Sequence, residues 1–327
     1  MSINKDEWMS HQQMLIKKTV ILRSVPIHTY RNFSGPWIEN IYFHHYQSNI
    51  EKYFTGMPTF YLPIFWTDIS QFLFNLYVDD TEYLDLYSKM LESKISHLYS
   101  SLNPTYKYFT IIQHDHGRDT LSFNDENKMP DNIYVYTMSG RGNHTIPMIK
   151  DDLLMNEKSI PIDERKYVFS YLGEIKRTPF IINDVHTDLR ITLVNYCHQV
   201  FKNEFIHYHG SDWIEYMRNS IFSLCPRGNA NTSFRMYEAL LLESIPIYIY
   251  IGNPTLPYMD IIPWSQIMIM IEFKDLINLA KLVYDWIPNI DNAILLIKKF
   301  KHMFTYDYLC QYIDDNIRDM KLSNTLF

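Results

Sequence analysis

The chain has 327 residues, of which 46% are hydrophobic and 16% aromatic. This length and composition exclude a mainly disordered protein and fit two domains of about 150 residues each. Thirty Lys and Arg residues against 37 Asp and Glu residues give a net charge of −7, which argues against a general nucleic-acid-binding protein. Any anion that the chain binds must therefore be held by a local cluster of basic side chains.

The three cysteines, Cys197, Cys225 and Cys310, share no CxxC spacing, so neither a disulfide framework nor a structural zinc site is expected. The N-terminal segment is polar and has no signal-peptide core. The apolar stretch 239–251 is interrupted by Glu243 and is shorter than the roughly 20 residues that span a membrane. We therefore expect a cytoplasmic protein without a membrane span.

In the first half of the chain, runs rich in β-branched and aromatic residues alternate with a helical pattern. The runs at 59–66, 106–113 and 132–137 predict strands, and the apolar spacing over 80–101 predicts a helix between the first two. Strands separated by helices indicate a parallel sheet in an α/β fold. A charged segment, 150–166, is interpreted as the linker to a second lobe.

After this segment, the alternation of strand-like and helical runs begins again. It predicts strands at 167–171, 221–224 and 245–251, helices at 187–201 and 233–243, and largely helical structure over 275–315. We therefore expect two α/β lobes, residues 1–155 and 156–327, with the terminal helices in the second. In such folds, ligands normally bind in a cleft between the lobes.

The stretch 220–250 has the order strand, loop, helix, strand, and its loop is suited to an anion. Gly228 lets a ligand approach the backbone closely, and Thr232 or Ser233 suits the N-cap of the following helix. A helix N-terminus offers free N–H groups and a positive partial charge. The loop is therefore a candidate phosphate-binding site.

Two arginines flank this loop. Arg227 precedes it and Arg235 falls in the first helical turn, so two guanidinium groups are available to clamp a diphosphate. Glu238 shares a helix face with Arg235 and is a candidate acceptor for ribose hydroxyls. The alternative is a surface loop with an exposed Arg235–Glu238 pair. Neither a Walker A motif nor a GxGxxG fingerprint occurs, which argues against a P-loop NTPase and weakens an NAD-dependent dehydrogenase.

The run from PRG at 226–228 through Arg235, Glu238-Ala239 and IPI at 245–247 resembles the signature of the exostosin-like glycosyltransferases of GT47 type. Weaker elements of that family follow the same order: FYLPIF at 60–65, His114-Asp115 with Gly117, Tyr171–Gly173, and LPY at 256–258 with Asp260, Trp264 and Glu272. The resemblance covers about residues 35–292. The membrane anchor and lumenal cysteines of animal and plant members are missing, so the chain is similar to the stand-alone versions of bacteria and large DNA viruses. For a viral protein, the expected cytoplasm is that of the host cell.

The resemblance implies a GT-B fold, with two Rossmann-like lobes that bind the acceptor mainly in the first and a nucleotide-sugar in the second. It also implies an inverting transfer of a sugar from a nucleoside-diphosphate donor, UDP-linked, to a carbohydrate acceptor. We expect neither nucleic acid nor a membrane as a partner. The donor-binding residues that it implies are Gly173, Lys176, Arg177, Arg227, Gly228, Thr232, Ser233, Arg235 and Glu238.

An inverting transfer needs one base to deprotonate the acceptor hydroxyl. Asp115, with His114 beside it, is the first candidate; Asp68 is the second and Glu39 the third. No Asp-X-Asp motif occurs, although metal-dependent GT-A transferases use it to hold a divalent ion against the diphosphate. Arginines and a helix N-terminus would neutralise the leaving group instead, so we expect no obligatory metal and no other cofactor.

Two alternatives stay open. The first is a catalytically silent protein of the same fold that binds a nucleotide-sugar or glycan. The second is a metal-dependent hydrolase centred on His114, Asp115 and His116, because imidazole and carboxylate groups are ligands for zinc, iron or manganese. Among the aromatic residues, Trp66 and Trp213 are candidates to stack on sugar rings.

Overall fold

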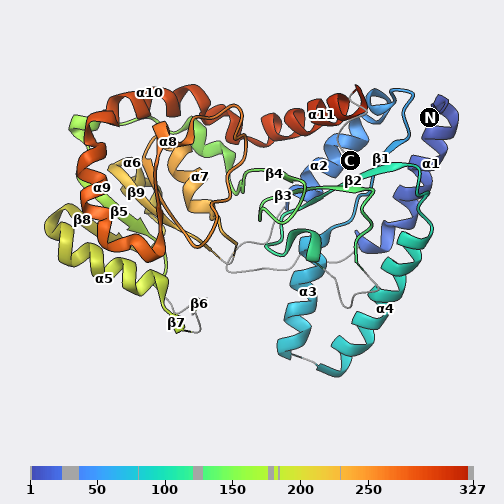
Figure 1. Cartoon of the computed structure of the whole chain (residues 1–327), viewed down its shortest axis with the longest axis horizontal. Helices are drawn as coiled ribbons and strands as arrows, with labels where there is room; N and C mark the ends of the chain where they lie inside the picture. Colours follow the sequence, from blue (N-terminus) through green and yellow to red (C-terminus); the bar gives the residue numbers. More distant parts are fainter. Residues whose placement is uncertain are drawn as a thin grey trace. The chain divides into compact units, whose positions relative to one another are not determined.

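The computed structural model describes residues 2–23, 37–79, 81–120, 128–175, 180–182, 185–228 and 230–322. The chain divides into two compact units (Figure 1). Unit 1 comprises Met1–Ile146 together with Leu309–Phe327, and unit 2 comprises Pro147–Tyr308. The expected division at 155/156 thus differs from the observed one at 146/147, and the end of the chain belongs to unit 1 rather than to the second lobe.

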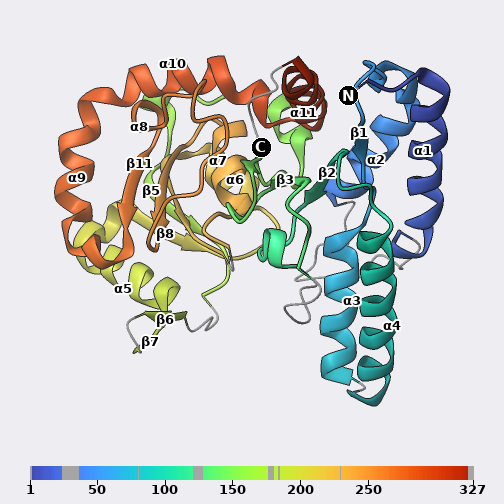
Figure 2. The ribbon, with the colours of Figure 1, turned by 45° about the vertical axis from the view of Figure 1, so that its right-hand side comes forward.

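Unit 1 is built on a four-stranded parallel sheet in the order β1-β2-β3-β4. Its strands are β1 (Thr59–Tyr61), β2 (Lys107–Ile112), β3 (Ile133–Thr137) and β4 (His144–Thr145). The helices of this unit are α1 (Lys5–Lys18), α2 (Ile38–Ser48), α3 (Trp66–Asp79) and α4 (Thr81–Ser100), with short 3₁₀ turns at Val20–Leu22, Ile50–Tyr53 and Gly117–Asp119. Helices α3 and α4 run side by side as a helical hairpin (Figure 2).

The first strand is shorter than its apolar run. Leu62 still donates its N–H to the Phe109 carbonyl at 2.8 Å, but Pro63 follows and has no N–H to continue the ladder. Trp66 already begins α3. The run 59–66 is therefore a three-residue strand and a connection to a helix, which brings the first turn of α3 to the carboxyl end of the sheet.

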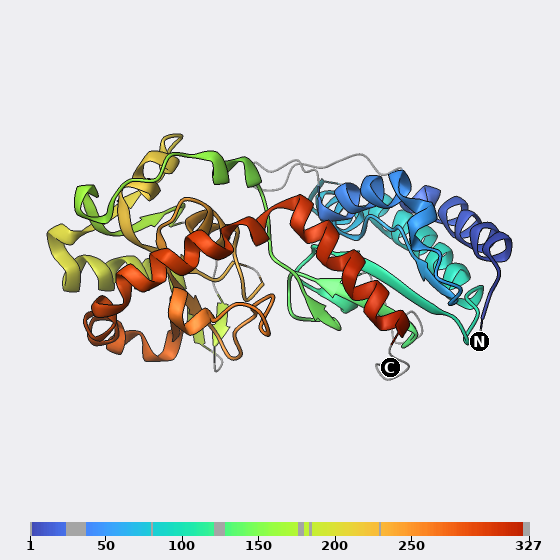
Figure 3. The ribbon, with the colours of Figure 1, turned by 90° about the horizontal axis from the view of Figure 1, so that it is seen from above.

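The last helix, α11 (Tyr306–Leu322), packs onto unit 1 (Figure 3). The Oδ1 atom of Asp314 accepts hydrogen bonds from the hydroxyls of Tyr42 at 2.9 Å and Tyr53 at 2.6 Å. Its Oδ2 atom lies 2.8 Å from His45 Nε2. These contacts between α11, α2 and the turn after α2 explain why the terminal helix belongs to unit 1.

Unit 2 contains a five-stranded parallel sheet in the order β11-β10-β9-β5-β8. Its strands are β5 (Tyr167–Leu172), β8 (Phe205–Tyr208), β9 (Ser220–Pro226), β10 (Ile245–Tyr250) and β11 (Ile269–Glu272), and a separate antiparallel pair is formed by β6 (Phe180–Ile182) and β7 (Val185–Thr187). The helices that accompany the sheet are α5 (Leu189–Phe201), α6 (Trp213–Arg218), α7 (Phe234–Leu241), α8 (Trp264–Ile267), α9 (Leu279–Trp286) and α10 (Ile290–Phe300), and 3₁₀ turns lie at Asp152–Asn156, Ile162–Glu164, Lys202–Glu204, Phe273–Asn278, Ile287–Asn289 and Lys301–Phe304.

The expected α/β class is confirmed, and so is the expectation of two lobes that are each built on a parallel sheet, as the GT-B fold requires. The central strands β9 and β10 are buried almost throughout, as in a sheet covered on both faces. The charged segment 150–166 is not a free linker, because it lies inside unit 2 and buries Leu154. The 3₁₀ turn Asp152–Asn156 packs against α7 and the turn Lys301–Phe304.

Two further expectations concern the thiols and the membrane. All three cysteines are free and buried, and burial raises the pKa of the Cys197 thiol to about 12. Within the described ranges, none of the helices has both the length and the apolar character that crossing a bilayer requires.

Candidate functional site

The loop between β9 and α7 is closed tightly onto the sheet of unit 2. The main-chain N–H of Arg227 donates to the Ile249 carbonyl at 2.9 Å, which extends the pairing of β9 with β10. One residue later, the N–H of Gly228 donates to the Thr232 carbonyl at 2.9 Å. A Cβ atom at Gly228 would lie 3.2 Å from that carbonyl oxygen, so a glycine suits this close return of the chain.

Asn231 fastens the loop from its other side, and it was not among the predicted site residues. Its Nδ2 donates to the carbonyls of Ile251 at 2.7 Å and Asn253 at 2.5 Å, while its Oδ1 accepts from the Ile251 N–H at 3.1 Å. The amide thus joins the loop to the segment after β10. Its spacing in the sequence carries no signal of this role, because the partners lie in another element.

The cap residue of α7 does not use its side chain to cap the helix. Ser233 is the N-cap and has the extended backbone typical of that position, yet its side chain makes no capping hydrogen bond. The Ser233 Oγ atom is buried and has no hydrogen-bond partner within the described part of the chain. A buried hydroxyl at a helix N-terminus is a position where an anionic ligand would supply the missing acceptor.

Arg235 is held in a fixed position in the first turn of α7. Its Nη1 atom lies 2.9 Å from Oε2 of Glu238, whose side chain is only 5% exposed. Its guanidinium carbon lies 4.4 Å from the ring centroid of Trp213, the first residue of α6. The alternative of an exposed surface pair is therefore wrong, because Glu238 is buried and Arg235 is sandwiched between a carboxylate and an indole ring.

The remaining residues of the predicted donor site lie at the end of β5. Gly173 continues the pairing with β8, because its N–H donates to the Tyr208 carbonyl at 3.0 Å and its own carbonyl lies 2.9 Å from His207 Nε2. Gly173 therefore leaves the sheet at the same carboxyl edge from which Arg227 leaves β9. Lys176 and Arg177 lie outside the described residues.

The three candidate bases all lie near the carboxyl end of the unit 1 sheet. Glu39 is in the first turn of α2 and Asp68 in the first turn of α3, and both are fully buried. Asp115 follows β2 and keeps a quarter of its side-chain surface exposed. Of the three carboxylates, Asp115 is thus the one that a molecule from solution can reach.

Burial sets the proton affinity of Glu39. Its Oε1 atom accepts three hydrogen bonds, from the Thr67 hydroxyl at 2.6 Å, the Thr67 N–H at 3.2 Å and the Gln113 N–H at 3.0 Å. Desolvation nevertheless dominates and raises the pKa of the Glu39 carboxyl to about 7. Its Oε2 atom is buried without a hydrogen-bond partner among the described residues.

Both ring nitrogens of His114 are in contact with the protein. Nε2 lies 2.9 Å from Ser70 Oγ, and Nδ1 lies 3.2 Å from Asp115 Oδ1. Thr120 Oγ1 and the main-chain N of His116 are further away from Nδ1, at 3.4 and 3.3 Å. Burial lowers the pKa of the His114 imidazole to about 4, against the opposing effect of Asp115, so the ring is neutral near pH 7.

These contacts bear on the metal alternative, because a metal ligand needs a ring nitrogen directed away from other partners. Nowhere in the ranges that the structure describes do three or more His, Cys, Asp or Glu side chains gather as a metal site.

The structure also shows the surroundings of the two tryptophans that were candidates to stack on sugar rings. Trp66 is fully buried and donates its indole N–H to Thr110 Oγ1 at 2.8 Å. The ring of Trp213 lies against the guanidinium group of Arg235.

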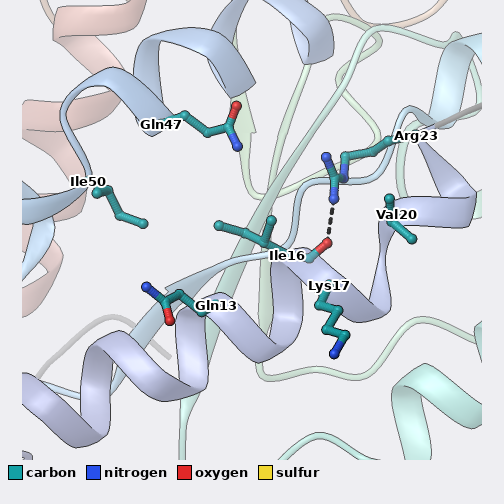
Figure 4. Close-up of a pocket in the computed structure, with 7 residues that line it drawn as sticks. All are labelled: Gln13, Ile16, Lys17, Val20, Arg23, Gln47 and Ile50. Atoms are coloured by element: carbon teal, nitrogen blue, oxygen red, sulfur yellow. Dashed lines mark hydrogen bonds between the residues drawn. The ribbon is translucent and has the colours of Figure 1, made fainter.

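A separate hollow of about 400 Å³ lies in unit 1 (Figure 4). Arg23 at its rim donates to the Ile16 carbonyl and lies over the ring of Phe43, 4.4 Å from the centroid. The hollow is lined by Gln13, Ile16, Lys17, Val20, Arg23, Gln47 and Ile50 and therefore includes none of the predicted site residues.

A parallel α/β unit in which a strand end leads into a helix N-terminus with a fixed arginine is typical of proteins that bind a phosphorylated ligand. Residues 81–285, more than half of the chain, match the Exostosin GT47 domain. The chain belongs to the exostosin GT47 family of glycosyltransferases. The matched span includes His114, Asp115 and the loop from Arg227 to Glu238, whereas Glu39 and Asp68 lie outside it.

Curated relatives match over shorter stretches. The chain is 29% identical over 119 residues to a "Probable glycosyltransferase" of Arabidopsis thaliana, which is 35% of this chain and 25% of that protein. It is 37% identical over 75 residues to "Probable glucuronosyltransferase 47 A" of Physcomitrium patens, covering 23% and 16% of the two chains. It is 39% identical over 67 residues to "Probable beta-1,4-xylosyltransferase IRX10L" of Arabidopsis thaliana, covering 20% and 16%. The chain thus spans a quarter or less of each of these relatives.

Two solved structures are similar at a low level. An alpha-glucosyltransferase in complex with UDP-glucose and DNA has a TM-score of 0.37 at 12% identity, covering 69% of this chain and 76% of that one. The pneumococcal O-GlcNAc transferase GtfA in complex with UDP and GlcNAc has a TM-score of 0.40 at 8% identity, covering 71% and 55%.

Proposed function

We propose that this protein is an inverting glycosyltransferase that moves a sugar from a UDP-linked donor to a carbohydrate acceptor. Membership of the GT47 family supports the reaction class. The observation that carries the donor assignment is the N-terminus of α7, where the buried Ser233 hydroxyl has no hydrogen-bond partner among the described residues and Arg235 is fixed in the same first turn.

In this proposal, unit 2 binds the nucleotide. The diphosphate accepts hydrogen bonds from the first N–H groups of α7 and from the Ser233 hydroxyl, and it pairs with the guanidinium groups of Arg235 and Arg227. As the bond to the sugar breaks, negative charge grows on the diphosphate, and these groups stabilise it without reorganisation. Thr232 and Gly228 shape the loop, and Glu238 both holds Arg235 and is the proposed partner of the ribose. Lys176 and Arg177 add positive charge in the same proposal.

The acceptor is bound mainly by unit 1, and Asp115 is the proposed base. Its exposed carboxylate takes the proton of the acceptor hydroxyl while the acceptor oxygen forms its bond to the anomeric carbon and the nucleoside diphosphate leaves from the opposite face. His114 is neutral near pH 7, and its Nδ1 atom lies 3.2 Å from the Asp115 carboxylate. Asp68 and Glu39 are less suitable because both are fully buried.

The test is a donor panel of UDP-glucose, UDP-galactose, UDP-N-acetylglucosamine, UDP-glucuronic acid and UDP-xylose, with UDP release as the readout. Each donor is offered with and without an oligosaccharide mixture, and with and without EDTA. We expect UDP release from one donor, faster with acceptor and unchanged by EDTA.

The alternatives predict other outcomes of the same panel. A silent binding protein would bind UDP and neither transfer nor hydrolyse a donor. A metal-dependent hydrolase would lose its activity in EDTA and would retain stoichiometric metal through purification.

A further inference from the structure

The carboxyl end of the unit 1 sheet is held by a closed ring of hydrogen bonds. Glu39 of α2 accepts from Thr67 of α3 and from the main chain of Gln113, the residue directly after β2. Ser70, one turn along α3 from Thr67, contacts His114, which follows Gln113 in the chain. The ring therefore runs from Glu39 through α3 to His114 and returns through Gln113.

The link between α2 and Gln113 is reciprocal. The Gln113 N–H donates to Glu39 Oε1 at 3.0 Å, and the Gln113 side-chain oxygen accepts from the N–H of Ile38, the first residue of α2, at 3.0 Å. Glu39, Gln113 and Thr67 are all buried. Their geometry therefore fixes where the chain leaves β2, and with it the positions of His114 and Asp115.

Glu39 itself does not reach a ligand in this arrangement. Its side chain is fully buried, its Oε1 atom is occupied by three donors, and its Oε2 atom has essentially no accessible surface. A base must contact the hydroxyl that it deprotonates. Glu39 thus acts on the reacting groups only through the residues that it holds.

The contacts of His114, including the one with Ser70, determine which of its ring nitrogens carries the proton. A neutral imidazole carries a single N–H, which sits on either Nδ1 or Nε2. The Nδ1 atom accepts a hydrogen bond from the main-chain N–H of His116 at 3.3 Å, and the Thr120 hydroxyl lies 3.4 Å from the same nitrogen. The Asp115 carboxylate lies 3.2 Å from it. An accepting Nδ1 leaves the proton of the neutral ring on Nε2, which lies 2.9 Å from Ser70 Oγ and donates to it.

We propose that Glu39 and Ser70 are positioning residues, which together hold His114 and Asp115 at the end of the sheet, with Ser70 accepting the Nε2 proton of His114 and so fixing the orientation of the imidazole beside Asp115. The inference rests on the proposed function in one respect, namely that Asp115 is the base. Without this ring of hydrogen bonds, Asp115 loses its orientation toward the acceptor hydroxyl. Displacement of a reacting group by about 1 Å costs up to about a hundredfold in rate.

The experiment compares Ser70→Ala, which removes the hydroxyl, with Ser70→Thr, which keeps it. Ser101→Ala is the matched control, because its hydroxyl also makes a part-buried hydrogen bond, to the Leu98 carbonyl, but lies outside the ring. With the UDP-sugar that the panel identifies, we expect Ser70→Ala to lower kcat about tenfold to a hundredfold. The donor KM should not change, Ser70→Thr should restore kcat, and Ser101→Ala should match the wild type.

The second readout is the ¹⁵N NMR spectrum of the imidazole nitrogens, in which His114 is identified by its absence from His114→Gln. We expect a protonated Nε2 in the wild type and in Ser70→Thr, and changed His114 signals in Ser70→Ala, in which the Nε2 proton loses its acceptor. Thr67→Val, which removes a donor to Glu39, should broaden or shift the same signals, and Thr67→Ser should restore them.

Each outcome decides one claim. Protonated Nδ1 in the wild type, or His114 signals in Ser70→Ala that match those of the wild type, overturns the positioning role of Ser70. Unchanged His114 signals in Thr67→Val overturn the role of Glu39. A wild-type protein that transfers no sugar contradicts the proposed function instead, and the NMR readout still decides the positioning roles.

Discussion

The guanidinium group of Arg235 lies over the indole ring of Trp213, 4.4 Å from the ring centroid. The ring and the Glu238 carboxylate hold this cation in place before any ligand arrives. A cation that is already positioned loses little conformational freedom when it binds a diphosphate, and preorganisation of this kind strengthens binding. The sequence places the two residues in separate helices, so neither motif nor spacing reveals the contact.

Trp213→Leu should therefore weaken UDP binding although Trp213 is not a proposed contact of the nucleotide. A cation–π contact is worth about 0.5–2 kcal/mol, so we expect a loss of affinity of about twofold to thirtyfold. Trp213→Phe keeps an aromatic face and should retain most of the affinity. Isothermal titration calorimetry with UDP measures both, and equal affinities for the Leu and Phe variants would show that the ring does not position Arg235.

Asp115→Asn should leave UDP affinity within twofold of the wild type and remove most of the transfer, because an amide cannot take the proton of the acceptor hydroxyl. Asp119→Asn is the control, since Asp119 is a nearby aspartate whose side chain is 69% exposed. Transfer rates with the active donor measure the effect. If Asp115→Asn keeps its activity, the base is another residue.

Glu39 makes the stability of the fold depend on pH. Its pKa is about 7 in the folded chain against 4.5 for the free side chain. Between these values the folded chain keeps the proton that the unfolded chain has released, so the free energy of unfolding falls as pH rises through this window and levels off above pH 7. The shift corresponds to about 3 kcal/mol, since one pKa unit is about 1.4 kcal/mol.

Glu39→Gln lacks this titration, so its stability relative to the wild type should rise by about 3 kcal/mol between pH 4.5 and pH 8. Urea unfolding of both proteins at the two pH values measures the change. The comparison between variant and wild type is needed because His114, with its lowered pKa, contributes in the opposite direction: its stabilising effect is lost as pH falls from 6.5 toward 4. A stability difference that is independent of pH would mean that Glu39 is ionised throughout.

Asp314→Ala should destabilise unit 1 by about 3 kcal/mol. The change removes the acceptor of the Tyr42 and Tyr53 hydroxyls and the partner of His45, and a hydrogen bond to a charged group contributes about 1.5–3 kcal/mol. Asp315→Ala is the control, because the next carboxylate is 54% exposed and pairs with Arg318 within the same helix. Thermal unfolding monitored by circular dichroism checks the difference; equal melting temperatures would contradict the packing of α11 on unit 1.

The sequence predicted the elements whose conformation is determined by residues that are neighbours in the chain. The runs that form β2, β3, β5 and β10 were placed within one or two residues of the observed strands, because fully buried parallel strands require continuous β-branched and aromatic residues. The run at 59–66 was too long as a strand because Pro63 interrupts the ladder. The loop before α7 was selected as a candidate site because a glycine, a cap residue and two arginines lie close together in the sequence.

What depends on distant partners was not predictable. Tyr42 and Asp314 are 272 positions apart, and their contact places the terminal helix in unit 1 rather than in the expected second lobe. Ser70 and His114 are 44 positions apart, and no periodicity links a serine in α3 to an imidazole after β2. Glu39 was selected only as a possible base, whereas its burial and its contact with Gln113 support a positioning role.

The central claim is that the N-terminus of α7 binds the diphosphate of a nucleotide, and its most direct test is nucleotide binding to the wild type and to Arg235→Ala. The measurement is a thermal shift with UDP, GDP, CMP, ADP and NAD, each with and without EDTA, followed by calorimetry. At 100 times its Kd, a ligand adds about 2.7 kcal/mol, which should raise the Tm of a cooperative unit the size of unit 2 by roughly 5–10 °C. We predict such a shift with UDP, indifferent to EDTA, and an affinity reduced by about 1.5–3 kcal/mol in Arg235→Ala. The absence of a shift with any nucleotide, or equal affinities of the two proteins for UDP, would contradict the account.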